Sequence, residues 1–103
     1  MIVNINRWVY ENRNGLLPTR RLLCRSGLSM SVQANRYCYC SPRRDMFPYY
    51  EFEVGYPTFD VHELQTYRQE DSEVYPYVPV EVIEWVVRKH GGIVNFHQFL
   101  LPS

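Results

Sequence analysis

Several features are missing from this 103-residue sequence, and each absence excludes a class of protein. No run of about 18 or more apolar residues occurs, so the sequence predicts no membrane-spanning helix. Residues 1–7 lack the basic start and long apolar stretch of a secretory signal, so we expect a cytoplasmic protein. Cysteine is scarce and odd in number (Cys24, Cys38 and Cys40), whereas disulfide-stapled secreted scaffolds usually carry an even set. We therefore expect reduced thiols.

Signatures of catalysis and of phosphate-binding loops are missing too. The sequence contains no Gly-x-Ser-x-Gly, no P-loop and no dinucleotide-binding glycine pattern. No cysteine or serine lies in a recognisable nucleophile context. We therefore expect a non-enzymatic protein that uses no cofactor.

A zinc site would be the alternative use of the cysteines. The candidate ligands are Cys24, Cys38, Cys40, His62, His90 and His97. Structural zinc sites usually hold their cysteines about two to four residues apart in a knuckle, whereas Cys-x-Cys in a strand points both thiols to one face. We favour small buried side chains in a reduced protein over a metal site.

Lysine is nearly absent, because ten of the 11 basic residues are arginines. The net charge is zero, but residues 1–44 carry eight arginines and one acid (net +7), and residues 45–103 carry three bases and ten acids (net −7). Arginine binds phosphate and carboxylate through two hydrogen bonds and stacks on aromatic rings. Either the two halves attract each other within one fold, or the arginines form an anion-binding face or a self-complementary surface that drives oligomerisation.

Alternation of apolar and polar residues predicts strands in the first half of the chain. Residues 2–10 have the pattern of a half-buried strand, followed by a hairpin turn at Asn14-Gly15. Residues 22–33 predict a second hairpin around Ser26-Gly27. Its second strand buries Leu28, Met30 and Val32. Residues 36–40 continue the alternation, with the two cysteines on one face and Tyr37 and Tyr39 on the other.

The second half predicts one more strand and one helix. Residues 49–57 form the strand, with Tyr50, Phe52 and Val54 facing one way and Glu51 and Glu53 the other. Residues 58–78 are mainly loop, with a helical turn around residues 61–67. The expected helix spans residues 79–90, because Pro79 suits its first position, charges of the right sign flank both ends, and Gly91-Gly92 can cap it. Its apolar residues are Val80, Val82, Ile83, Trp85, Val86 and Val87.

An α+β fold follows from these elements: a small antiparallel sheet of four to five strands with one helix packed on a face. Residues 93–101 form a last strand or an extended tail. We expect a single domain over residues 1–103, in which residues 1–25 form an N-terminal hairpin extension.

The segment from residue 33 to residue 44 combines the groups that a nucleotide needs. Tyrosine can stack on a base, amide side chains can read its edge, and hydroxyl and guanidinium groups can hold its phosphate. The candidate ligand-binding residues are Ser31, Gln33, Asn35, Tyr37, Tyr39, Ser41, Arg43 and Arg44. The alternative is that the tyrosines pack on the sheet and the arginines pair with the acidic half. Long nucleic acid is disfavoured, because zero net charge and an acidic half would repel a polyanion.

A protein partner is the other class of ligand that the composition favours. The nine tyrosines, the two tryptophans and the abundance of arginine match the residue types enriched at interaction hot spots. The acidic stretch of residues 69–77, QEDSEVYPY, could also imitate a phosphate backbone. Aromatic residues are also the usual material of a core, so both interpretations stay open.

Three segments together resemble a group of small proteins encoded by tailed bacteriophages: SGLSMSVQANRYCYCSPR, YYEFEVGYP and YPYVPVEVIEWVVRKHGGI. The resemblance covers residues 26–93 and leaves out residues 1–25. It implies an accessory protein that counters host defence in the cytoplasm of an infected bacterium, by binding either a protein or a nucleotide immune signal. The site residues that it implies are Ser31, Gln33, Tyr39, Cys40, Ser41 and Arg43. It implies no particular ligand, since none is established for the group.

Our leading hypothesis is a phage accessory protein that sequesters a small nucleotide-type anionic signal, with a homo-oligomer interface completing the pocket. The first alternative is a protein-binding inhibitor of a host defence enzyme, similar in kind to an anti-CRISPR protein. The second is a small virion or assembly component.

Overall fold

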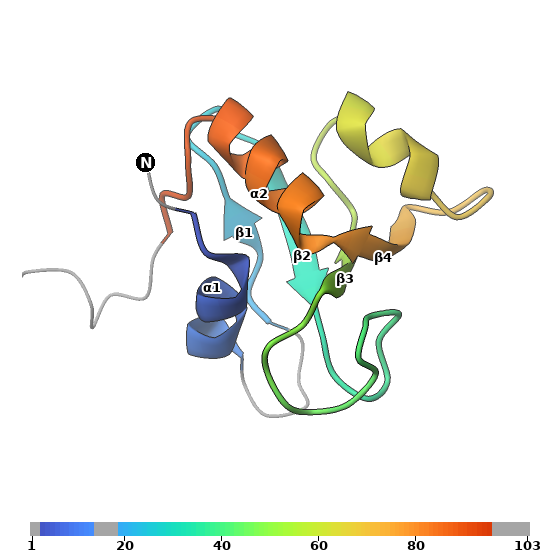
Figure 1. Cartoon of the computed structure of the whole chain (residues 1–103). Coiled ribbons are helices and arrows are strands. Elements are labelled where there is room, and N and C mark those ends of the chain that lie inside the picture. Colours follow the sequence, from blue (N-terminus) through green and yellow to red (C-terminus); the bar gives the residue numbers. More distant parts are fainter. Residues whose placement is uncertain (1–2, 14–18, 96–103) are drawn as a thin grey trace, which may run out of the picture.

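A computed structural model describes residues 3–13 and 19–95 of the chain (Figure 1). Its elements, in order, are α1 (Ile5–Asn12), β1 (Leu22–Leu23), β2 (Ser29–Gln33), β3 (Glu51–Gly55), the 3₁₀-helix η1 (His62–Tyr67), β4 (Val74–Pro79) and α2 (Val80–Lys89). The four strands form one antiparallel sheet in the order β1-β2-β3-β4. The predicted α+β fold, with a helix in the C-terminal half, is confirmed.

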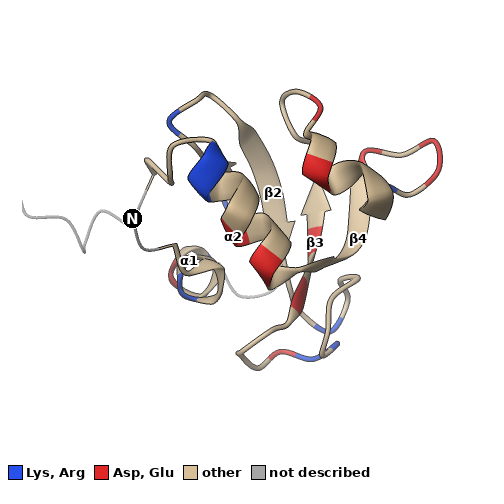
Figure 2. Cartoon of the chain, turned by 45° about the horizontal axis from the view of Figure 1, so that its top comes forward, with Lys and Arg blue, Asp and Glu red and all other residues tan. Residues whose placement is uncertain are grey.

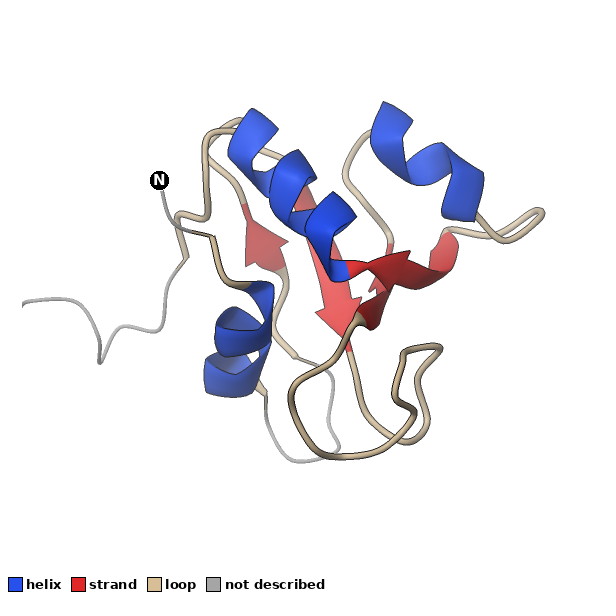
Figure 3. Ribbon diagram, in the orientation of Figure 1, coloured by secondary structure: helices blue, strands red, loops and turns tan. Residues whose placement is uncertain are grey.

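The helices lie together on one side of the sheet. α2 runs across the sheet, and α1 and η1 lie on either side of α2 and contact it (Figures 1 and 3). Between these layers lies the core, to which α1, the sheet, η1 and α2 all contribute buried side chains. None of the helices in the described part of the chain has the length or apolar character needed to span a bilayer.

The alternation predicted for β2 and β3 is confirmed. Met30 and Val32 in β2 and Phe52 and Val54 in β3 are buried, and the residues between them are half-buried. The β1–β2 hairpin pairs Leu22 with Met30. Its turn contains Gly27 at a φ of 97°, a conformation that glycine adopts without strain. The open face of β2 therefore presents polar side chains, as expected.

Helix α2 matches the prediction closely. Ile83, Val86 and Val87 are buried against the sheet. Trp85, by contrast, does not join the core, because 57% of it is exposed. Gly91 follows the helix at a φ of 89°, and a Cβ atom there would lie 2.9 Å from Cβ of Arg25. Glycine is therefore required at this helix end for both conformation and space.

The strand predicted for residues 2–10 is wrong, because the chain forms helix α1 there. Asn4 caps the helix: its Oδ1 accepts the backbone N–H of Arg7 at 3.0 Å. The buried residues Ile5, Trp8, Val9 and Asn12 follow the helical spacing of three and four residues. The turn predicted at residues 14–15 lies outside the described residues.

Three smaller predictions are also corrected. Residues 36–40 form turns instead of continuing a strand. In the segment before β3, Tyr49 is buried, whereas Tyr50 is 67% exposed. Residues 74–78, expected within a loop, belong to strand β4, which ends at Pro79, while the helical turn expected around residues 61–67 is present as η1. Pro76 and Pro79 hid β4 in the sequence, since proline is tolerated in a strand mainly at an edge of the sheet.

Both edges of the sheet are closed by other parts of the chain. At the β1 edge, Leu23 donates its backbone N–H to Asn95 Oδ1 at 2.8 Å and accepts the N–H of Val94 at 2.9 Å. At the β4 edge, the carbonyl oxygen of Val74 accepts the N–H of Gln69 at 2.9 Å. Pro76 also lacks the N–H that a further strand would need. The described part of residues 93–101 thus lies along β1, and residues 96–101 are outside the described part.

Candidate functional site

The loop of residues 34–50 joins β2 to β3 and holds most of the predicted site residues. Its first turn is built around Asn35, whose Oδ1 accepts the backbone N–H of Tyr37 at 2.7 Å. The Asn35 carbonyl oxygen accepts the N–H of Cys38 at 3.1 Å and the thiol of Cys40 at 3.2 Å. Asparagine favours such turns, because its short side chain can replace a backbone acceptor.

Polar contacts fix this loop to the sheet. Glu53 Oε1 accepts the backbone N–H of Tyr39 at 3.1 Å, and Glu51 Oε1 accepts the hydroxyl of Ser41 at 2.7 Å. At the far end of the loop, the buried hydroxyl of Tyr49 donates to the carbonyl oxygen of Arg44. The outward-facing acids of β3 therefore hold the loop in place.

Four of the eight predicted site residues use their side chains inside the protein. Gln33 accepts the N–H of Thr19 at 2.9 Å, and it donates to the Thr19 carbonyl oxygen at 3.1 Å and to Ser31 Oγ at 3.0 Å. Asn35 and Ser41 are engaged as described above. These side chains fasten neighbouring segments together, so they are not free to read the edge of a base.

The other four predicted residues lie on the surface. Tyr37 is 65% exposed and Tyr39 40% exposed, and Arg43 and Arg44 are exposed beside them. The Arg43 guanidinium carbon lies 5.6 Å from the centre of the Tyr39 ring, within the range of a cation–π contact.

Sequence reasoning missed Tyr77, which comes from the edge strand β4. Its ring centre lies 6.0 Å from that of Tyr39, with the planes tilted by 54°. No local pattern marks Tyr77 as a site residue, because only the pairing of β4 with β3 brings it to the loop. We call the six residues at this place the arginine–tyrosine face. They are Arg36, Tyr37, Tyr39, Arg43, Arg44 and Tyr77.

The charges of this face are only partly neutralised. Arg36 pairs with Asp45, at 3.4 Å between Nε and Oδ2, and its guanidinium also lies over the Tyr37 ring. Within residues 3–13 and 19–95, no hydrogen bond or ion pair uses the guanidinium group of Arg43 or Arg44. Two positive charges therefore remain available to an anion.

The acidic half of the chain does not neutralise the basic half in the described structure. Of the four ion pairs there, only Arg36–Asp45 joins residues 1–44 to residues 45–103, and its two members are close in sequence. The other three pairs are Arg7–Glu11, Arg68–Glu73 and Lys89–Glu63. Attraction between the halves thus contributes little direct pairing.

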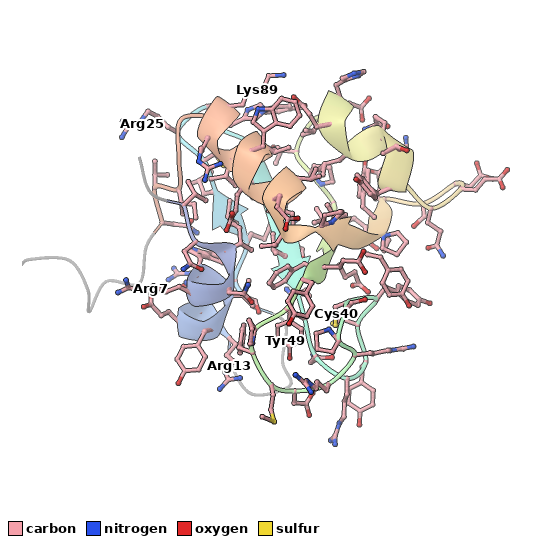
Figure 4. The ribbon with its side chains drawn as sticks, in the orientation of Figure 1. Arg7, Arg13, Arg25, Cys40, Tyr49 and Lys89 are labelled. Atoms are coloured by element: carbon pink, nitrogen blue, oxygen red, sulfur yellow. The ribbon has the colours of Figure 1, made fainter. Side chains whose placement is uncertain are left out.

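A second aromatic cluster lies at the same end of the molecule. The Arg13 guanidinium is 4.7 Å from the ring centre of Tyr10 and 5.3 Å from that of Phe47. Figure 4 shows Arg13, Tyr49 and Cys40 together at this end, opposite Arg25 and Lys89. Met46 and Tyr50 of the loop are also largely exposed. The loop end of the molecule is therefore rich in exposed aromatic and arginine side chains.

The cysteines have the properties of core residues. Cys24 and Cys40 are buried and Cys38 is half-buried, and none forms a disulfide. Burial raises the pKa of the Cys24 thiol from 9.0 to about 11. Burial, together with the nearby Glu53 carboxylate, raises the pKa of Cys38 to about 11. These thiols stay protonated at neutral pH, which makes them poor nucleophiles.

No three histidine, cysteine or carboxylate side chains of the described residues lie close enough to hold a metal ion. The face offers guanidinium groups, which can bind an anion, and exposed rings, which can pack against a flat or apolar group. Comparisons with protein-family models, with curated proteins and with solved structures find no match to this chain. No relative therefore supplies a ligand for the face.

Proposed function

We propose that the protein is a non-enzymatic phage accessory protein that sequesters a small nucleotide-type anion at the arginine–tyrosine face. The observation that supports this is the position of Arg43, which stacks on Tyr39 and has no carboxylate partner among the described residues. Tyr77 packs against Tyr39, and the exposed Arg44 follows Arg43 in the loop. In an infected bacterium, such binding would remove a nucleotide immune signal from its receptor.

The two parts of a nucleotide would use different side chains. The base would stack on the exposed surface of Tyr39 or Tyr77, which is worth roughly 1–3 kcal/mol. A phosphate would receive charge-assisted hydrogen bonds from Arg43 and Arg44, each worth about 1.5–3 kcal/mol. After subtraction of the cost of immobilising the ligand, we expect a dissociation constant on the order of micromolar.

This form of the proposal differs from the sequence-based hypothesis in one respect. Gln33 and Asn35 were expected to read the edge of the base, but both are engaged within the protein. Stacking and phosphate contacts discriminate weakly among bases, because every base has a stacking surface. We therefore expect selectivity for the number and position of phosphates rather than for one base.

Isothermal titration calorimetry and thermal unfolding with a panel of nucleotides test the proposal. The panel contains nucleoside mono-, di- and triphosphates, cyclic mono- and dinucleotides, and inorganic phosphate. Binding should raise the midpoint of unfolding, and at equal ligand concentration a tighter-binding nucleotide should raise it further. Arg43→Ala and Arg44→Ala should each weaken binding about tenfold or more, whereas Arg25→Ala, which removes the same charge from the opposite end, should not. If all three variants bind equally, or if no nucleotide binds, the proposal is wrong.

A protein-binding inhibitor of a host defence enzyme is the second candidate. Tyr10, Met46 and Tyr50 favour it, because they add exposed apolar surface at the loop end of the molecule, beyond what a nucleotide would cover. Tyr50→Ala distinguishes the two functions. This substitution should leave nucleotide binding unchanged, but it should weaken a complex with a protein partner by about tenfold or more if Tyr50 is a hot spot.

A further inference from the structure

The outer surface of α2 carries a stripe of three exposed residues. Glu81, Trp85 and Arg88 are separated by four and three positions, so they lie along one line on the helix. Trp85 is more than half exposed, whereas the other tryptophan of the chain, Trp8, is 3% exposed. A large exposed ring in the middle of a helix surface is the kind of side chain that anchors an interface.

The two charges of the stripe have no partner among the described residues, unlike the charges next to them. Glu84 accepts the backbone N–H of Ile5 at 3.3 Å, and Lys89 donates to Glu63 at 2.7 Å. Neither Glu81 nor Arg88 takes part in a side-chain hydrogen bond or ion pair within residues 3–13 and 19–95. Figure 2 shows the acidic colour where α2 follows β4 and the basic colour at the other end of the helix.

We propose that this stripe binds a second copy of the same chain, with the two α2 helices antiparallel about a two-fold axis. Trp85 of one copy would pack on Trp85 of the other. Glu81 and Arg88 lie about 10 Å apart along the helix, on opposite sides of Trp85. In the antiparallel arrangement, Glu81 of each copy therefore meets Arg88 of the other, and the interface satisfies both charges twice.

The charges of the stripe favour a second copy of the chain as the partner and an antiparallel orientation of the two helices. A parallel pair of helices would place Glu81 against Glu81 and Arg88 against Arg88, which is repulsive. Pairing of two sheets edge to edge is disfavoured, because residues 93–95 cover β1 and residues around 69 cover β4. The stripe lies on α2, whereas the arginine–tyrosine face lies on the loop of residues 34–50 and on Tyr77 of β4, so either proposal can fail without the other.

Sedimentation of the full chain over a wide range of concentration tests the dimer. The wild-type protein should pass from a mass of 12.4 kDa to twice that value as its concentration rises. Glu81→Arg and Arg88→Glu each place like charges together at two symmetric contacts, so each should weaken the dimer on the order of tenfold or more. Trp85→Ala should weaken it as well.

Two further samples separate this interface from any other. The double variant Glu81→Arg with Arg88→Glu exchanges the charges and should dimerise as the wild type does. An equimolar mixture of the two single variants should form a heterodimer, because every contact across the two-fold axis is again between opposite charges. Circular dichroism confirms that each variant is folded. The proposal would be overturned if the wild-type protein stays monomeric, or if neither Glu81→Arg nor Arg88→Glu weakens the dimer.

Discussion

Tyr77 donates its backbone N–H to the carbonyl oxygen of Tyr39 at 3.0 Å, so the edge strand β4 holds the loop that carries Arg43. This contact occurs at an irregularity in the sheet. Phe52 pairs with Val78 and Val54 pairs with Tyr75, so β4 has one more residue than β3 between these pairs. Tyr77 lies in this bulge with a φ of 55°, a left-handed conformation that is strained for a residue with a side chain. Bulges of this kind redirect a side chain, here toward Tyr39.

Tyr77→Gly should keep the fold and weaken nucleotide binding. Glycine adopts positive φ freely, so the substitution relieves roughly 1–2 kcal/mol of backbone strain. This gain should offset two losses, the ring contacts of Tyr77 and the extra flexibility that glycine gives the unfolded chain, so the free energy of unfolding should change little. Binding loses a stacking surface. Tyr56→Gly is the matched control, since Tyr56 also has a positive φ, of 52°, but lies outside the face. Calorimetry should show weaker binding for Tyr77→Gly but not for Tyr56→Gly. Equal binding by the two variants would show that Tyr77 is not part of the site.

Tyr75→Phe should leave the free energy of unfolding unchanged or raise it by about 1 kcal/mol. Tyr75 is fully buried, and its hydroxyl has no hydrogen-bond partner among the described residues, so removing the oxygen relieves a desolvation cost. Tyr49→Phe is the contrasting variant, because the Tyr49 hydroxyl donates to the Arg44 carbonyl oxygen. Its loss should destabilise by about 1–3 kcal/mol. Urea denaturation measures both, and a destabilised Tyr75→Phe would contradict the assignment.

Glu63→Gln should destabilise the protein at neutral pH by roughly 0.5–1 kcal/mol and much less in acid. The hydrogen bond from Lys89 lowers the pKa of the mostly buried Glu63 below its ordinary value of 4.5. A carboxyl group whose pKa is lowered in the folded state stabilises the protein at pH values above its ordinary pKa. This stabilisation is lost as the pH falls through the pKa of the folded state. The difference between wild type and variant, measured by denaturation from neutral pH down to about 3, should therefore shrink on acidification. A constant difference would mean that Glu63 acts through packing alone.

The native cysteines should react slowly with a thiol reagent. A pKa near 11 for Cys24 and Cys38, in place of 9.0, leaves about a hundredfold less thiolate at neutral pH. Absorbance after addition of a disulfide reagent should rise much more slowly for the folded protein than for the protein in denaturant. Cys38→Ser identifies the contribution of the half-buried cysteine. Rapid reaction of one native thiol would reveal a reactive site that burial does not predict.

The elements that the sequence predicted well are those with local capping or turn signals. Helix α2 has charges of the right sign and Gly91, and the β1–β2 hairpin has Gly27 at its turn. The segment of helix α1 favours a strand in the sequence because Val3 and Ile5 alternate with polar residues, whereas the signal for a helix is the single capping residue Asn4. Strand β4 was missed because acidic residues precede it and two prolines lie within it, and only its pairing with β3 makes it a strand.

The candidate site could be predicted only in part, for a related reason. The sequence indicated that residues 33–44 combine tyrosine, amide and guanidinium groups, and the structure places Tyr39 next to Arg43. The sequence could not indicate that Gln33 is hydrogen-bonded to Thr19 or that Ser41 is hydrogen-bonded to Glu51, because these partners are distant in sequence. Whether a polar side chain is available depends on such long-range contacts.

The closed edges of the sheet have a consequence for how much of this protein a cell can tolerate. A protein that sequesters a ligand must accumulate to at least the amount of that ligand. At high concentration, copies with unpaired strand edges would pair through those edges and form fibrils. Residues 93–95 cover the edge of β1, and the prolines of β4 interrupt the row of N–H groups at the other edge, so neither edge offers a full set of partners to another strand. Contacts between copies are then left to side chains, such as those of the stripe on α2.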